Sequence, residues 1–200
     1  MVLHFTAMQS CNAALERLCA PEHEVSAHYL IGRTGTLFQL VAEENRAWHA
    51  GVGSWGGQDD INSRSIGIEL DNDGATPFSA PQMARLEDLL PGILERWKIP
   101  RHGVIGHSDM APTRKSDPGR RFDWKRLALQ GLAVWPGPGR AMAPDPTAFH
   151  QAASRFGYPP EHSPVTLLEA FRQRFRPWAR GPLSSADMGA ITALAAQYPA

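Results

Sequence analysis

Residues 104–119, VIGHSDMAPTRKSDPG, place a short apolar strand directly before a polar loop rich in proline. Val104 and Ile105 have the pattern of a buried strand. Loops that follow strands often hold the groups that bind or react. This loop offers an imidazole, two carboxylates and an amine, which are His107, Asp109, Asp117 and Lys115. We therefore expect the chemistry of the molecule to lie where this strand meets its loop.

Strand and helix patterns alternate through the residues before this loop. The segment SIGIEL, residues 65–70, alternates in a way that is typical of a half-buried strand, with Glu69 on its less apolar face. Ser79 and Gln82 match a capping box that begins a helix, and Pro91 should kink that helix. The other expected elements are a strand at 1–6, a helix at 11–19, and a hairpin of strands 26–31 and 36–41. This alternation predicts an α/β body.

The composition changes between residues 131 and 146, where the stretch GLAVWPGPGRAMAPDP is dense in proline and glycine. We place a domain boundary near Pro144, which divides the chain into residues 1–143 and 144–200. Three helices are expected in the second part, at 147–156, at 165–175 and after Ser184. This small three-helix module has no cluster of metal-binding side chains, so we expect it to carry no catalytic residue.

Charge and hydropathy exclude several classes of protein. The 200 residues include twenty basic and twenty acidic side chains, and a net charge of zero argues against a nucleic-acid partner. No apolar run approaches the roughly 18 residues of a transmembrane segment, and no signal peptide is visible. Cys11 and Cys19 are too far apart on one helix, about 12 Å, to form a disulfide. We expect a cytoplasmic monomer; the alternative is the periplasm or the outer membrane, if the true start lies upstream.

The polar loop has the side chains of a metal site. Imidazole and carboxylate are ordinary zinc ligands, and a loop that returns on itself can bring His107 and Asp117 to one ion. The ten-residue spacing of His107 and Asp117 is by itself a weak indication of a metal site, because a surface loop rich in turn-forming residues can have the same composition. A catalytic zinc needs a third protein ligand and an open position. Candidates for that third ligand among the eight histidines are His4, His23, His28, His49 and His102.

Six segments in a fixed order point to a known family. VLHFTAM, VSAHYLI, GTLFQLV, RAWHAG, INSRSIGIEL and GHSDMAPTRKSDPG resemble the zinc-dependent, amidase-2 type of N-acetylmuramoyl-L-alanine amidases, over residues 2–135. That family is related in fold to the T7 lysozyme-like amidases and the peptidoglycan recognition proteins, which implies a mixed central β-sheet flanked by helices. The segment LLEAFRQRFRP, residues 167–177, resembles the peptidoglycan-binding-like module of the AmiD branch. The AmpD branch, which recycles anhydromuropeptides, shares the catalytic motifs without this module.

The resemblance implies a role for five residues. His4, His107 and Asp117 would bind a Zn²⁺ cofactor, with water or hydroxide in the fourth position. Glu69 would act as the general base, and Lys115 would stabilise the oxyanion. The bond cleaved would be the amide between N-acetylmuramic acid, or its 1,6-anhydro form, and L-alanine. The implied partners are therefore peptidoglycan fragments, the muropeptides.

Other residues near these motifs are candidates for substrate contacts. Trp48 and His49 in RAWHAG would line the groove for sugar or stem peptide, or else form a packed pair in the core. Asn62 and Arg64 can meet a stem-peptide carboxylate, although a solvated loop is the simpler interpretation for Arg64. Asp109 is expected to cap the loop rather than to bind the metal.

Two other functions compete with the amidase. A peptidoglycan recognition protein that does not cleave its ligand would keep the groove and lack a metal ligand. A structural zinc would only lock the loop and would leave Glu69 and Lys115 without a purpose. The presence of all five implied residues favours the enzyme.

Overall fold

A five-stranded sheet forms the centre of the protein in the computed structural model, which describes residues 1–137 and 139–200. Its strand order is β3-β2-β4-β1-β5. The strands are β1 (Val2–Phe5), β2 (Tyr29–Ile31), β3 (Leu37–Gln39), β4 (Gly67–Leu70) and β5 (Ile105–Gly106). The pairs β1–β4, β1–β5 and β2–β4 are parallel, and β2–β3 is the expected antiparallel hairpin. The predicted mixed sheet is therefore confirmed.

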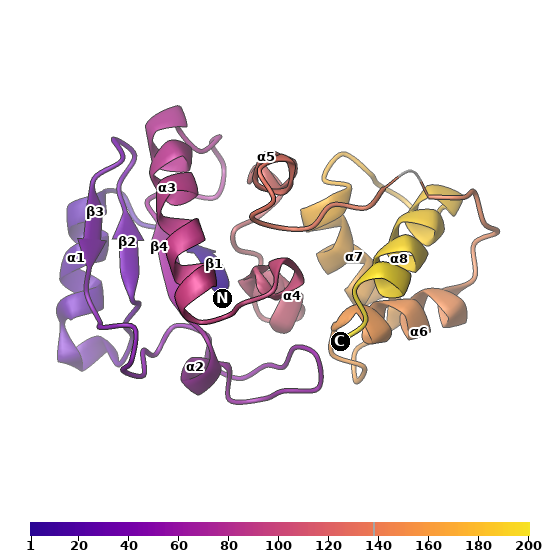
Figure 1. The fold of residues 1–200 in the computed structure, drawn as a ribbon, viewed down its shortest axis with the longest axis horizontal. Coiled ribbons are helices and arrows are strands. Elements are labelled where there is room, and N and C mark those ends of the chain that lie inside the picture. The colour runs from indigo at the N-terminus through magenta and orange to yellow at the C-terminus, as the bar shows by residue number, and fades with distance from the viewer. Residues whose placement is uncertain (138) are drawn as a thin grey trace.

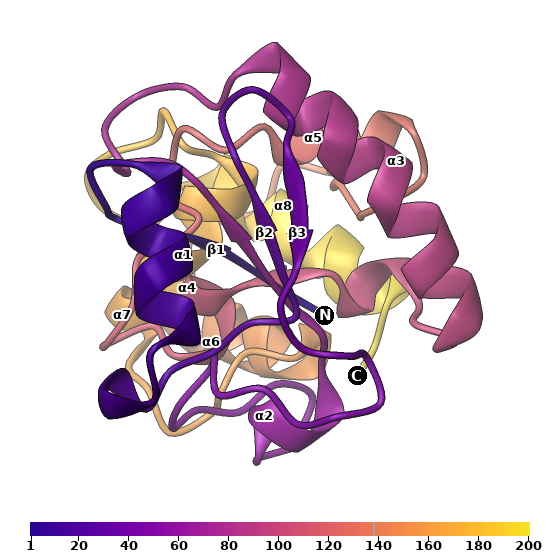
Figure 2. The same cartoon turned by 90° about the vertical axis from the view of Figure 1, so that its left-hand side faces the viewer.

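Helices cover both faces of this sheet, and Figure 2 shows the strands running between α1 and α3. The helices of the body are α1 (Cys11–Cys19), α2 (Ile61–Arg64), α3 (Ala80–Arg96), α4 (His107–Met110) and α5 (Trp124–Leu129), with single 3₁₀ turns at Pro21–His23 and Arg101–Gly103. Ser79 caps α3 as expected, because its side chain accepts a hydrogen bond from the backbone N–H of Gln82. Pro91 lies inside α3, which continues past it without a break.

The alternation of side chains along the strands divides the sheet into an apolar face and a face that carries the polar groups. Leu3 and Ile68 pack with α3 in the main core, together with Leu86 and Leu90. His4 pairs in register with Glu69 on the neighbouring parallel strand, so both side chains lie on the opposite face. The half-buried strand predicted around Glu69 is thus confirmed, and its register places Glu69 beside His4.

The loop after β5 begins with a helical turn, α4, which the expectation of a wholly irregular segment missed. The Asp109 side chain explains this turn, because its Oδ2 accepts a hydrogen bond from the N–H of Gly106 at 2.8 Å. The carboxylate thereby satisfies a backbone donor that the start of a helix leaves free. Asp109 is the cap that the sequence predicted, and His107 is the first residue of the capped turn.

The C-terminal residues form the predicted three-helix module, which Figure 1 shows beside the sheet. Its helices are α6 (Pro146–Phe156), α7 (Pro164–Phe175) and α8 (Ser185–Gln197). They enclose a separate aromatic core that includes Phe149, Phe156, Phe171 and Phe175. Val134 belongs to this core and Trp135 contacts both cores, so the segment before α6 links the two packing units. Within residues 1–137 and 139–200, no helix is both long and apolar enough to cross a membrane.

Candidate metal centre and active site

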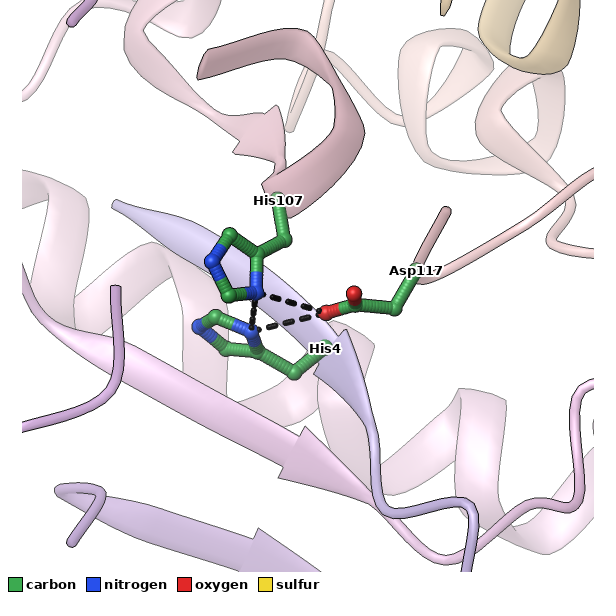
Figure 3. Close-up of side chains that lie close together, drawn as sticks. All are labelled: His4, His107 and Asp117. Atoms are coloured by element: carbon green, nitrogen blue, oxygen red, sulfur yellow. Dashed lines mark hydrogen bonds and ion pairs between the residues drawn. The ribbon is translucent and has the colours of Figure 1, made fainter. Parts of the chain in front are cut away.

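Three side chains from distant parts of the sequence meet at the carboxyl end of β1. His4 comes from β1, His107 from the first position of α4, and Asp117 from the loop that follows (Figure 3). The Nδ1 atom of His4 lies 2.9 Å from Nδ1 of His107 and 2.9 Å from Oδ2 of Asp117. The Nδ1 atom of His107 lies 3.0 Å from the same oxygen. All three residues are buried, and together they form a group that can hold a metal ion.

The proton on His4 can be placed from the hydrogen bonds behind it. The Ser65 hydroxyl donates to the carbonyl oxygen of Ile61 at 2.7 Å, so it accepts from Nε2 of His49, which is 3.3 Å away. Nδ1 of His49 is then an acceptor, and it lies 3.1 Å from Nε2 of His4. His4 therefore carries its proton on Nε2, which leaves a lone pair on Nδ1. Burial and the nearby His107 lower the pKa of His4 to about 4, which favours this neutral form.

The other two donors are arranged in the same way. Nε2 of His107 lies 2.8 Å from the carbonyl oxygen of Ala50, which can only accept, so the free lone pair of His107 is also on Nδ1. Burial raises the pKa of Asp117, but the adjacent imidazoles of His107 and His4 outweigh it and hold that pKa well below its usual range. Asp117 is thus a carboxylate at neutral pH.

This donor set fits a zinc ion. Two lone pairs and a carboxylate oxygen that face one another at 2.9 to 3.0 Å repel each other unless a cation lies between them. Tetrahedral zinc with bonds of about 2.0 Å would separate its ligand atoms by about 3.3 Å, which needs only a small outward movement of each side chain. Two imidazoles and one carboxylate are also a ligand set of catalytic zinc sites, which keep the fourth position open.

Glu69 lies beside this group with little to stabilise its charge. Its Oε2 is buried and has no hydrogen-bond partner among the described residues. Burial and the neighbouring charge of Asp117 raise the pKa of Glu69 to about 8, although Lys115 acts in the opposite direction. A carboxyl group with this pKa can take up and release a proton near neutral pH, which is the property of a general base or acid.

A cavity of about 370 Å³ opens above these residues. Lys115 is exposed and lines it together with His4 and Glu69. The apolar side of the cavity is lined by Leu18, Val25 and Trp48, and these three also line a second, adjoining cavity of about 540 Å³. The two cavities form an extended groove with charged groups at one end. Trp48 is 55% exposed there, as expected for a residue that lines the groove.

The structure places two of the other three candidates for substrate contact, Asn62 and Arg64, away from the open groove, whereas His49 is at the wall of the cavity. His49 is only 8% exposed, and it hydrogen-bonds with His4, a candidate metal ligand. Asn62 is also buried, and its Oδ1 accepts from the backbone N–H groups of His49 and Ala50 at 3.0 and 2.8 Å. Arg64 is exposed and lines a different cavity, together with Arg46 and Trp97. Neither Asn62 nor Arg64 lines the cavity above Glu69.

Two residues near the metal group were not expected from the sequence. Ser65 fixes the proton on His49, but a serine at the start of a strand gives no signal of that kind. Arg114 lines the cavity, and its Nη2 donates to the carbonyl oxygens of Ala50 and Val52 at 2.5 and 2.6 Å, which ties the RAWHAG segment to the loop of Asp117. The adjacent basic pair Arg114–Lys115, between two expected ligands, is the feature that points to it.

Comparison with known proteins gives the same family as the motifs. The family model described as N-acetylmuramoyl-L-alanine amidase matches residues 1–120. The amidase AmiD of Escherichia coli strain K12 is 34% identical over 222 residues, covering 96% of this chain and 79% of AmiD. The 1,6-anhydro-N-acetylmuramyl-L-alanine amidase AmpD of Haemophilus influenzae is 44% identical over 103 residues, covering 51% of this chain and 56% of AmpD. The likeness to AmiD thus extends into the three-helix module.

Solved structures of relatives agree over almost the whole chain. Escherichia coli AmiD, in a complex with the substrate anhydro-N-acetylmuramic acid-L-Ala-D-gamma-Glu-L-Lys, has a TM-score of 0.90 at 33% identity, covering 98% of this chain and 88% of AmiD. AmpDh3 of Pseudomonas aeruginosa, in a complex with anhydromuramic pentapeptide, has a TM-score of 0.91 at 33% identity, covering 100% of this chain and 91% of AmpDh3. With its body and module both matched, the chain belongs to the amidase-2 family of N-acetylmuramoyl-L-alanine amidases.

Proposed function

We propose that this amidase is a zinc enzyme that hydrolyses the amide between the lactyl group of N-acetylmuramic acid and L-alanine, with His4, His107 and Asp117 as the metal ligands. One observation carries the proposal. The hydrogen bonds behind the two histidines direct both Nδ1 lone pairs towards the Asp117 carboxylate, at 2.9 to 3.0 Å. Such a convergence of electron donors is unfavourable without a cation.

The bound zinc would lower the pKa of a water molecule to about 7 and polarise the scissile carbonyl. Glu69 is the group that would accept the proton of that water and deliver it to the leaving amine of L-alanine. Its register opposite His4 puts it beside the ligands, and its unpartnered, buried Oε2 is free to accept a proton. A positioned general base typically contributes about 100- to 10,000-fold to the rate.

Lys115 would act on the other side of the scissile carbonyl. Lys115 lines the cavity, two residues before Asp117, and its positive charge acts to lower the pKa of Glu69. Negative charge develops on the carbonyl oxygen when water adds to the amide. A fixed positive charge at that point stabilises the transition state more than the ground state.

The shape of the groove supports a muropeptide as substrate. The amide to be cleaved would lie at the charged end of the groove. The apolar wall of Leu18, Val25 and Trp48 can contact sugar or stem peptide. Relatives with the same two-part fold have been solved with anhydro-N-acetylmuramic acid-L-Ala-D-gamma-Glu-L-Lys, a muramoyl tripeptide, and with an anhydromuramic pentapeptide. We therefore infer that this chain accepts muropeptides whose muramic acid is in the 1,6-anhydro or the ordinary form.

The experiment combines metal analysis with product analysis. Wild-type protein should contain about one zinc per chain and release a free stem peptide, which mass spectrometry identifies. Asp117→Ala should lose zinc and activity together. Glu69→Gln should keep zinc and lose activity about 100- to 10,000-fold. Glu16→Gln, on the exposed side of α1, is the matched control and should change neither quantity. Binding of a muropeptide without cleavage by the zinc-loaded wild type would instead support a recognition protein.

Two expectations from the sequence stay predictions. Light scattering of the purified protein tests the monomer, and fractionation of cells that express the full coding sequence tests the cytoplasmic location.

A further inference from the structure

Arg174 crosses from the C-terminal module to the loop of the metal ligands. It lies in α7, and its Nη1 donates to Oδ2 of Asp109 at 2.9 Å. The side chains of both residues are 1% exposed. Asp109 is two residues from His107, in the same helical turn. A buried charge is held only where it is paired and hydrogen-bonded, so this contact ties the module firmly to the turn.

The Asp109 carboxylate accepts three hydrogen bonds. Oδ2 accepts from the N–H of Gly106 at 2.8 Å as well as from Arg174, and Oδ1 accepts from the hydroxyl of Tyr158 at 2.8 Å. Gly106 immediately precedes His107, so the carboxylate closes the turn that carries this ligand. Two of the three donors, Arg174 and Tyr158, come from the module.

Arg174 also holds the other end of the same segment. Its Nη2 donates to the carbonyl oxygen of Val104 at 2.8 Å, and its guanidinium lies 4.5 Å from the centre of the Trp124 ring. One planar, rigid cation thus binds the backbone three residues before His107 and the side chain two residues after it. The segment between these points contains β5 and the first turn of α4. Its position relative to His4 and Asp117 therefore depends on a residue of the module.

We propose that Arg174 is a positioning residue of the metal centre, through which the C-terminal module holds His107 in the geometry that zinc requires. The proposal rests on the zinc site of the proposed function. Metal ligands must be held within about 0.5 Å of their productive positions. Loss of groups that orient a ligand typically weakens metal affinity about 10- to 100-fold. The module thus takes part in catalysis without supplying a group that touches the substrate.

The same helix supplies a matched control. Arg172, two residues earlier, forms a buried ion pair with Asp187 at 2.6 Å, entirely within the module, and both side chains are at most 1% exposed. Arg172→Met and Arg174→Met each remove one buried arginine from α7. Only Arg174→Met releases Val104 and Asp109. A general loss of stability affects both variants, whereas a positioning effect appears in the Arg174 variant alone.

The experiment measures zinc dissociation constants by competition with a chelator, in full-length proteins that circular dichroism shows to be folded. Arg174→Met should weaken zinc binding about 10- to 100-fold and change the absorption spectrum of the cobalt-substituted protein. Arg174→Lys, which keeps a charge for Asp109, should recover part of the affinity. Arg172→Met should lower the melting temperature and leave the zinc constant and the cobalt spectrum unchanged.

Tyr158→Phe is the second test variant, for use if Arg174→Met does not fold. It removes only the hydroxyl that donates to Asp109, and it should weaken zinc binding severalfold in the same direction. The positioning role is overturned if the folded Arg174 or Tyr158 variant binds zinc as tightly as the wild type. It is also overturned if Arg172→Met loses as much zinc affinity as Arg174→Met. Either result leaves the zinc site of the wild type intact. A wild type that binds no zinc contradicts the proposed function itself.

Discussion

The proton on His4 leads to a prediction about His49, a residue that binds neither zinc nor substrate in the proposed mechanism. Replacing His49 with leucine removes the acceptor 3.1 Å from Nε2 of His4, in a region where His4 is 1% exposed and His49 is 8% exposed. His4 then has a buried, unpaired N–H. It can recover a hydrogen bond by moving its proton to Nδ1, where Asp117 accepts it, but Nδ1 is then no longer a metal ligand.

The size of the effect follows from the cost of that unpaired group. A buried donor without a partner costs about 1 to 3 kcal/mol, and zinc binding must restore the unfavourable tautomer before it can use Nδ1. This free energy corresponds to a loss of about 5- to 150-fold in zinc affinity. His49→Asn has nearly the same shape as His49→Leu, and its Oδ1 is as many bonds from Cα as the histidine Nδ1. It should keep zinc affinity within a fewfold of wild type.

The assay is again chelator competition, with long-range ¹H–¹⁵N spectra of the metal-free histidines as a second measurement. The spectra should show the His4 proton on Nε2 in the wild type and in His49→Asn, and on Nδ1 in His49→Leu. Gly67→Ala offers an independent approach, because a Cβ at Gly67 would overlap the His49 ring and displace it. Equal zinc affinity in the leucine and asparagine variants would refute the reasoning.

Three further predictions concern the substrate and the module. Lys115→Met should lower kcat on the order of 100- to 1000-fold while the zinc content stays at the wild-type level, as measured on a soluble muropeptide. Trp48→Ala should raise KM about threefold to tenfold with little change in kcat, because the exposed indole contributes contact area and no charge; an unchanged KM would contradict its place in the groove. Although burial opposes it, hydrogen bonds from Arg172 and Ser184 lower the pKa of Asp187 to about 2. The charge of Asp187 therefore stabilises the fold fully above its ordinary pKa of 3.8, and this effect disappears as the pH falls towards 2. The urea midpoint of unfolding should fall over that pH range in the wild type. It should fall less steeply in Asp187→Asn, which has no carboxyl group to protonate at this position.

The strands and the donor groups of the candidate metal site could be predicted from short segments of the sequence. Alternation in SIGIEL places Glu69 on the polar face of its strand, and the structure bears this out. The spacing of His107 and Asp117 allowed a shared ion, and the structure brings their ligand atoms to 3.0 Å. The register of β1 against β4 could not be read in this way, because parallel strands have no connecting turn to fix it. That register alone puts His4 beside Glu69.

The buried polar candidates show the limit of interpretation from sequence alone. Asn62 and His49 are polar residues beside an aromatic motif, so their composition suggests a binding surface. Both are buried, and both accept hydrogen bonds from donors elsewhere in the chain. Asn62 accepts from the backbone N–H groups of His49 and Ala50, and His49 accepts from Nε2 of His4. A buried polar group that satisfies another part of the chain has no local pattern. Only the fold separates it from a residue that faces the ligand.

The contact of Arg174 with Asp109 extends this argument to the whole module. The two residues are 65 positions apart, and Arg174 stands in a helix whose pattern predicts only an amphipathic surface. Asp109 could be predicted as a cap of its loop. Its hydrogen bond with the N–H of Gly106 would by itself stabilise a four-residue helix only weakly. In the folded chain two donors from the module complete its hydrogen bonds and remove it from water. The position of the His107 turn therefore depends on both packing units, and the proposed metal ligand His107 is held by donors that the amidase motifs alone do not supply.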